Sequence, residues 1–205
     1  MIAIIDYDAG NIKSVEKALL FLGQEAVSTR DPETILSADG VILPGVGAFG
    51  DAMEKLNAYG LTSVIRQCAH ENKPFLGICL GLQLLFDSSE ESPGVEGLGI
   101  LKGRIVRLPG EMGLKIPHIG WNDLRFPNPG RLFQGVQEGA YVYFVHSYYL
   151  RAEEESIVTA TTDYGACVQA SVEKGNVFAC QFHPEKSSDV GMQILRNFIR
   201  VTKEA

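Results

Sequence analysis

Cysteine is scarce in this sequence, and no two cysteines form a C-x-x-C pair. The four thiols, Cys68, Cys79, Cys167 and Cys180, lie at wide and irregular spacings in a chain of 205 residues. A disulfide-stapled secreted domain or a zinc ribbon would need closely spaced pairs. We therefore expect reduced thiols and a cytoplasmic protein.

Basic residues are also few. Lysine and arginine number 18 against 25 aspartates and glutamates, which gives a net charge of -7. No segment of the sequence forms a basic stripe. Because nucleic-acid binding depends on clustered positive charge, we do not expect a nucleic acid as partner.

Long apolar runs are missing as well. The longest, over residues 75–86, is interrupted by Gln83 and is too short to span a bilayer. No basic region stands before Asp6 in the opening MIAIID, so we expect neither a signal peptide nor a membrane partner. At roughly 100–200 residues per domain, residues 1–205 are predicted to form one domain.

In the first half of the chain, short apolar runs alternate with helical patterns. Runs at 2–5, 41–43 and 75–78 predict strands that are buried on both faces, and turns follow at 6–11 and 44–47. Helices are expected at 15–22, 49–57, 61–72 and 80–87. Such alternation is typical of an α/β fold with a mostly parallel central sheet and helices on both faces.

The second half of the chain has a different pattern. Its strand-like segments are 105–108, 141–150, 157–162, 167–173 and 177–182, and residues 174–176 form a hairpin turn signal. A last amphipathic helix follows, for which Ser187 or Ser188 is the expected cap. We therefore predict an antiparallel addition to the parallel sheet.

The most informative cysteine is Cys79, which stands in GICLG between a buried strand and a helix. Glycines two residues to either side permit a sharp strand-to-helix turn that exposes the side chain, as in a nucleophile elbow. The following helix directs its first N–H groups at the thiol and favours a thiolate. The alternative is that Cys79 is a small buried residue of the core, and this is the better interpretation of the other three cysteines.

A cysteine nucleophile needs a base, and the base needs an orienting group. His183 follows a predicted strand at the edge where α/β sheets place ligands. In extended backbone, Glu185 would point the same way and could accept from one nitrogen of His183 while the other faces Cys79. A surface His-Glu pair is the alternative. His70 fits a solvated helix end, His118 and His146 could be structural, and no third ligand supports a metal site.

These residues lie in motifs that resemble those of the class I (triad) glutamine amidotransferases. The motifs are PGVG at 44–47, GICLGLQLL at 77–85 and QFHPEKS at 181–187, and they occur in the family's order. The resemblance covers the whole chain. It implies that Cys79 attacks the side-chain amide of glutamine, that His183 transfers the protons and that Glu185 orients His183.

The resemblance also implies a substrate site that needs no cofactor and no metal. The oxyanion hole would use Leu80 N–H and a peptide of the 45–47 loop, hence Val46 and Gly47. Glutamine would be bound by Gly45, Gln83, Glu91, Ser147 and Tyr148, where Glu91 is preferred to Glu90 for the ammonium group. The alternative for Glu90 and Glu91 is a solvated acidic loop.

Within the family, the segments DYDAGN (6–11), PHIGWN (117–122) and YFVHSYY (143–149) are most similar to glutaminase subunits of imidazole glycerol phosphate synthases. One departure is Asp8, where that motif often has glycine. The similarity implies a heterodimer with a separate cyclase subunit folded as a (β/α)8 barrel. Trp121, predicted in a polar loop, would be an aromatic anchor of that interface. Asn11, Asn122, Tyr143 and Lys186 would lie near it.

Three other functions remain open at this point. The chain could serve another synthase, such as the one that makes anthranilate, and then only the ammonia acceptor would differ. It could be a cysteine hydrolase or peptidase that acts alone. It could also be an inactive interaction subunit, although the intact set Cys79, His183 and Glu185 argues against that.

Overall fold

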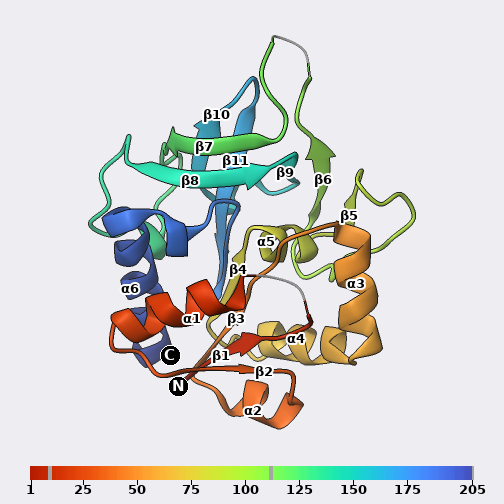
Figure 1. The fold of residues 1–205 in the computed structure, drawn as a ribbon, viewed down its shortest axis with the longest axis vertical. Coiled ribbons are helices and arrows are strands. Elements are labelled where there is room, and N and C mark those ends of the chain that lie inside the picture. Colours follow the sequence, from red (N-terminus) through yellow and green to blue (C-terminus); the bar gives the residue numbers. More distant parts are fainter. Residues whose placement is uncertain (9–10, 111–112, 205) are drawn as a thin grey trace.

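The computed structural model describes residues 1–8, 11–110 and 113–204. Its largest feature is a ten-stranded sheet that runs through the molecule (Figure 1). Five neighbouring strands are parallel, in the order β2 (Ala26–Thr29), β1 (Ile2–Ile5), β3 (Gly40–Leu43), β4 (Phe75–Ile78) and β12 (Val177–Cys180). The predicted parallel core is confirmed. Ala9 and Gly10, which belong to the predicted turn 6–11, lie outside the described residues.

Helices cover both faces of the parallel strands, as expected. One face packs against α1 (Ile12–Phe21) and α6 (Ser188–Glu204). The other packs against α2 (Pro32–Ser37), α3 (Phe49–Ala58), α4 (Leu61–His70) and α5 (Leu80–Leu84). All residues of β1, β3, β4 and β12 are buried, which explains why these strands are continuous apolar runs without alternation.

The antiparallel addition continues the same sheet beyond β12. It consists of β11 (Cys167–Lys174), β9 (Tyr148–Ala152) and β6 (Gly103–Arg107), with β10 (Val158–Asp163) paired to β11; the short β5 (Ser88–Ser89) at the edge is parallel to β6. The predicted hairpin turn is present: Lys174 pairs with Val177, and Gly175 between them has a φ of 59°. The described residues also form three 3-10 turns, at Arg131–Phe133, Glu155–Ile157 and Pro184–Lys186.

A separate two-stranded sheet, β7 (His118–Asp123) with β8 (Tyr141–His146), lies above α1 and the parallel strands in Figure 1. Two predictions were wrong here. Trp121 lies in a strand and not in a loop, because it pairs with Tyr143 of β8. The segment 141–150 is not one strand: it is divided at Ser147, where the chain leaves β8 and enters β9 of the large sheet.

Two elements of the parallel half were absent from the prediction. β2 is only partly buried along its length and contains Ser28 and Thr29, so it lacks a strong apolar signal. The six residues of α2 are held instead by local chemistry, since the Asp31 side chain accepts from Thr34 N–H and Pro32 opens the helix. None of the helices described here is long and apolar enough to cross a membrane.

Candidate active site

Cys79 occupies a sharp turn between β4 and α5. Its φ of 56° is rare for a residue with a side chain. A Cβ atom at Gly77 would lie 2.7 Å from the Gly81 carbonyl oxygen, and one at Gly81 would overlap the Leu43 carbonyl oxygen. Glycine is therefore required on both sides of Cys79, and the predicted nucleophile elbow is present.

His183 reaches the same edge of the sheet from the neighbouring strand. β12 runs parallel to β4, with Cys180 opposite Ile78, and the Cys79 N–H donates to the Cys180 carbonyl at 2.8 Å. His183 Nδ1 lies 2.8 Å from Glu185 Oε1. Glu185 belongs to the 3-10 turn Pro184–Lys186, so the contact is made within a turn and not along extended backbone as predicted.

The pair is buried, unlike the surface His-Glu pair that the sequence left as an alternative: the side chains of His183 and Glu185 are 2% and 1% exposed. The Ser187 hydroxyl donates to the His183 carbonyl at 2.6 Å and accepts from Tyr143 N–H at 3.0 Å. His183 N–H in turn donates to the Tyr143 carbonyl at 2.9 Å. Strand β8 thus fixes the backbone of His183 through these hydrogen bonds.

The electrostatics of His183 favour its protonated form. Burial by itself lowers the pKa of this imidazole, but contact with Cys79 and Glu185 outweighs it and raises the pKa to about 9. His183 Nε2 is buried and has no hydrogen-bond partner among the described residues. The Cys79 thiol lies 3.8 Å from the Val145 carbonyl and 3.7 Å from Gln181 Nε2. The Cys79 thiol and the His183 imidazole are therefore both buried at this edge of the sheet.

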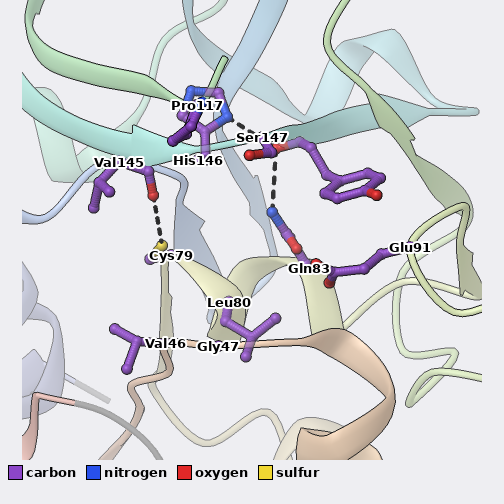
Figure 2. Close-up of a pocket in the computed structure, with 11 residues that line it drawn as sticks. Val46, Gly47, Cys79, Leu80, Gln83, Glu91, Pro117, Val145, His146 and Ser147 are labelled. Atoms are coloured by element: carbon purple, nitrogen blue, oxygen red, sulfur yellow. Dashed lines mark hydrogen bonds between the residues drawn. The ribbon is translucent and has the colours of Figure 1, made fainter.

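A cleft of about 290 Å³ opens beside Cys79 (Figure 2). It is lined by Val46, Gly47, Cys79, Leu80, Gln83, Glu91, Pro117, Val145, His146, Ser147 and Tyr148. The structure thus places every predicted oxyanion and substrate residue in its wall except Gly45. Gly45 borders the adjacent space next to His183 and Glu185.

The predicted oxyanion hole is closed by the chain itself. Leu80 N–H donates to the carbonyl of Gly45 at 3.4 Å. This carbonyl belongs to the Gly45–Val46 peptide, so that peptide presents its oxygen, and not the Val46 N–H, to the site. Gly47, which follows, has a φ of 102°. In this state an oxyanion would meet a carbonyl where it needs donors.

Two predicted substrate residues are already engaged in the protein. Glu91 accepts from Phe49 N–H at 2.8 Å, at the N-terminus of α3, whereas Glu90 accepts from Arg107 N–H outside the cleft. Gln83 Nε2 donates to the Tyr148 carbonyl at 3.2 Å and to Gln181 Oε1 at 3.0 Å. Both amide hydrogens of Gln83 are therefore used within the protein.

The predicted interface residues lie on β7, on β8, in the turn after His183 and at the N-terminus of α1. Trp121 is 52% exposed and stacks edge-on against Tyr143, with ring centroids 6.1 Å apart. Lys186 is exposed next to Glu185, and Asn11 borders the same small space as His183. Asn122 faces the opposite side of β7 from Trp121, and its side chain donates to the Asp163 carbonyl at 2.9 Å.

Sequence reasoning missed Gln181, Pro117 and the Val145 carbonyl, and it left His146 unassigned. Gln181 stands two residues before His183 in QFHPEKS, and that spacing was the available signal for it. The other three are brought to Cys79 only by the β7–β8 sheet. No group of three or more His, Cys, Asp or Glu side chains in the described ranges could hold a metal ion.

Comparison with known proteins gives consistent results over the full chain. Residues 3–201 match the family described as glutamine amidotransferase class-I. The imidazole glycerol phosphate synthase subunit HisH of Moorella thermoacetica is 54% identical over 204 residues, which cover 100% of this chain and 96% of the relative. The subunit of the same name from Geobacillus kaustophilus is 52% identical, covering 98% and 97%.

Solved structures share the fold at lower identity. A crystal structure described as a glutamine amidotransferase superposes with a TM-score of 0.78 at 22% identity, covering 99% of this chain and 100% of that one. The structure of PurLQS from Thermotoga maritima gives a TM-score of 0.73 at 19% identity, covering 98% and 97%. These likenesses concern the fold alone.

Proposed function

The chain belongs to the class I glutamine amidotransferase family, and from this premise we propose that it is the glutaminase subunit of imidazole glycerol phosphate synthase. The observation that carries the proposal is the meeting of Cys79, His183 and Glu185 at one sheet edge, in a chain that relatives of that name match from end to end. It would release ammonia from glutamine for a separate subunit, and residues 1–205 would act as one domain.

The triad performs the hydrolysis in two halves. The Cys79 thiolate attacks the side-chain amide carbon of glutamine, and the C–N bond breaks as His183 delivers its proton to the departing ammonia. With a pKa of about 9, His183 holds that proton at neutral pH. In the second half, His183 takes a proton from water, which attacks the γ-glutamyl thioester and releases glutamate. Glu185 keeps the imidazole oriented throughout.

The lining of the cleft supports a proposal for the substrate contacts. The Glu91 carboxylate would receive the ammonium group of glutamine, because it reaches the cleft while Glu90 does not. The main chain of Ser147 and Tyr148 would bind the α-carboxylate end, and Gly45 and Gln83 would border the amide. Because both amide hydrogens of Gln83 are engaged, its free oxygen is the atom that remains for the substrate.

The closed oxyanion hole corresponds to a resting state of the enzyme, before the partner and the acceptor bind. Rotation of the Gly45–Val46 peptide would remove the carbonyl from Leu80 N–H and present Val46 N–H as the second donor. Such a rotation changes ψ of Gly45 and φ of Val46, and Gly45, which has no side chain, tolerates a wide range of backbone angles. Because one missing oxyanion donor costs on the order of 10²–10³ in rate, the chain alone should be a slow glutaminase.

The partner would be a cyclase subunit with a (β/α)8 barrel, bound as a heterodimer over the exposed face of β7 and β8. Trp121 and Tyr143 are the proposed anchors, with Asn11, Asn122 and Lys186 at the margin. There the ammonia would react with a phosphoribulosyl formimino carboxamide ribonucleotide to give imidazole glycerol phosphate and aminoimidazole carboxamide ribonucleotide. The four free cysteines fit work in the cytoplasm.

Titration of the cyclase subunit into this chain, with and without that ribonucleotide, tests the proposal through glutamate release. We expect a rise of at least about 10²-fold when both are present, since the second oxyanion donor becomes available. Asparagine, whose amide is one methylene nearer the backbone, serves as the control substrate. Full turnover by the chain alone, or equal use of asparagine, would favour a stand-alone hydrolase.

A further inference from the structure

Two histidines that the triad does not use face each other inside the β7–β8 sheet. His118 and His146 are directly opposite in register and only 3% and 5% exposed. Nδ1 of His118 lies 3.0 Å from Nε2 of His146. Two buried imidazoles in direct contact need a defined arrangement of protons, because only one of the two facing nitrogens can donate.

The surrounding acceptors determine that arrangement. Nδ1 of His146 lies 2.8 Å from the Tyr148 carbonyl, which can only accept, so this nitrogen holds the proton. Nε2 of the neutral His146 is then bare and accepts from Nδ1–H of His118. Burial lowers the pKa of both histidines to about 4, so both are neutral at neutral pH.

The same carbonyl links this pair to the nucleophile. In Figure 2, dashed lines from His146 and from Gln83 lead to the main chain that lines the cleft, where both side chains donate to the Tyr148 carbonyl. Gln83 also donates to Gln181, and Gln181 donates to the Cys79 sulfur at 3.7 Å. A chain of hydrogen bonds thus connects His118 to the thiol, and its direction reverses at the Tyr148 carbonyl, which accepts from His146 and from Gln83.

His118 is also held on its outer side. Its ring stacks on Tyr164 with centroids 3.8 Å apart and on Phe144 at 4.9 Å. Tyr164 is fixed by a hydrogen bond from its hydroxyl to the Lys115 carbonyl. The next residue in β7, Ile119, points outward and is 60% exposed. Strand β7 therefore carries His118 on its inner face and the exposed Ile119 on its outer face.

We propose that His118 and His146 are positioning residues for glutamine hydrolysis: a neutral pair with fixed tautomers that holds the Tyr148 carbonyl and so sets the Ser147–Tyr148 main chain against the cleft. This inference rests on the proposed glutaminase function. If the pair acts in this way, the placement of glutamine depends on the Nδ1 proton of His118, which does not itself contact the Cys79 sulfur.

Two variants of His118 separate its hydrogen bond from its packing. His118→Phe keeps a ring to stack on Tyr164 but removes the donor, whereas His118→Asn keeps a donor near the position of Nδ1 but removes the ring. In the complex with the cyclase subunit, His118→Phe should raise the KM for glutamine about tenfold because a buried acceptor is left unpaired. His118→Asn should stay near the wild-type KM. The kcat of both variants should change little.

A wild-type KM in His118→Phe, or an equal loss in both variants, would overturn the proposal. Ammonia-dependent synthesis should be unaffected in both, and failure of the wild type to hydrolyse glutamine would instead refute the underlying function. If both variants fail to fold, nitrogen NMR of the wild-type imidazoles decides. We expect Nδ1–H tautomers in both histidines from pH 8 to about pH 5; an Nε2–H tautomer in His146 would refute the mechanism.

Discussion

The parallel and antiparallel parts of this molecule supply different kinds of atoms to the same cleft. The parallel strands β4 and β12 lead to Cys79 and His183, so this part contributes the side chains that are proposed to react. The antiparallel part contributes main-chain atoms, from Val145, Ser147 and Tyr148. In the proposed mechanism, the reacting side chains are thus placed by buried parallel strands, while the substrate contacts come from the segment that joins β8 of the small sheet to β9 of the large one.

The histidines show the same contrast in their electrostatics. His183, His118 and His146 are all nearly inaccessible to solvent. Burial alone would lower the pKa of each, as it does for His118 and His146, to about 4. His183 differs because Glu185 and Cys79 lie against it and raise its pKa to about 9. The neighbouring groups, and not the degree of burial, decide which of the three histidines is protonated at neutral pH.

The largest expected effect on glutamine-dependent synthesis comes from removing Cys79, the proposed nucleophile in the parallel part. Cys79→Ala should reduce glutamine-dependent synthesis by about 10⁶-fold, as loss of a triad nucleophile does, because no thioester can form. Ammonia-dependent synthesis by the complex should remain within about twofold of wild type, since that route bypasses the triad. Both rates are measured on the reconstituted complex, with glutamine and then with an ammonium salt at alkaline pH.

Cys167→Ala is the matched control, because Cys167 is an exposed thiol outside the cleft. It should leave both rates unchanged. Glutamine-dependent turnover that survives in Cys79→Ala would contradict the assignment of the nucleophile.

The second effect concerns the carboxylate that distinguishes His183 from the other two histidines. Glu185→Gln should cost about 10⁴-fold in kcat, about a hundredfold less than His183→Ala, because Glu185 orients the imidazole but transfers no proton. Single-turnover formation of the thioester measures both. A greater loss in the Glu185 variant would reverse the two roles.

The pH profile of Glu185→Gln sharpens the comparison. His183 must be protonated to release ammonia, so kcat/KM of the wild type should fall as pH rises through about 9. Without the carboxylate, the pKa of His183 falls because burial lowers it and one of the opposing charges is gone. The alkaline fall should therefore move to lower pH. An unchanged alkaline limb would show that Glu185 does not set this pKa.

The parallel part of the fold was predictable because its signals are local. Buried strands such as β1 and β4 are short apolar runs, and the motif that predicts the elbow at Cys79 spans only the five residues 77–81. β2 escaped prediction because it is only partly buried and half polar. Ser147 was placed inside one long strand because the apolar pattern continues across it, although the chain changes sheets there.

The site was predictable only as far as its side chains lie in motifs. Cys79, His183 and Glu185 could be named because spacing and residue type define their chemistry. The contact between Gln181 and Cys79 joins residues 102 positions apart, and the His118–His146 pair depends on the register of β7 with β8. No local sequence pattern predicts that register or the hydrogen bond from Leu80 N–H to the Gly45 carbonyl. Such contacts are set by tertiary packing.

The smallest of these effects should come from the outer face of the antiparallel part. Trp121→Ala is expected to weaken binding of the cyclase subunit about 30-fold, the loss of a tryptophan anchor worth about 2 kcal/mol. At saturating partner, kcat for glutamine should match the wild type, since Trp121 touches no reacting group. The free energy of unfolding should change by at most about 0.5 kcal/mol, because the side chain is 52% exposed.

Phe21→Ala is the control: Phe21 is 77% exposed at the end of α1 opposite Asn11, outside the proposed interface. Affinity measured by calorimetry should fall for Trp121→Ala only. An equal loss in both variants would mean that the partner docks elsewhere, and that the division between a reacting part and a docking part is wrong.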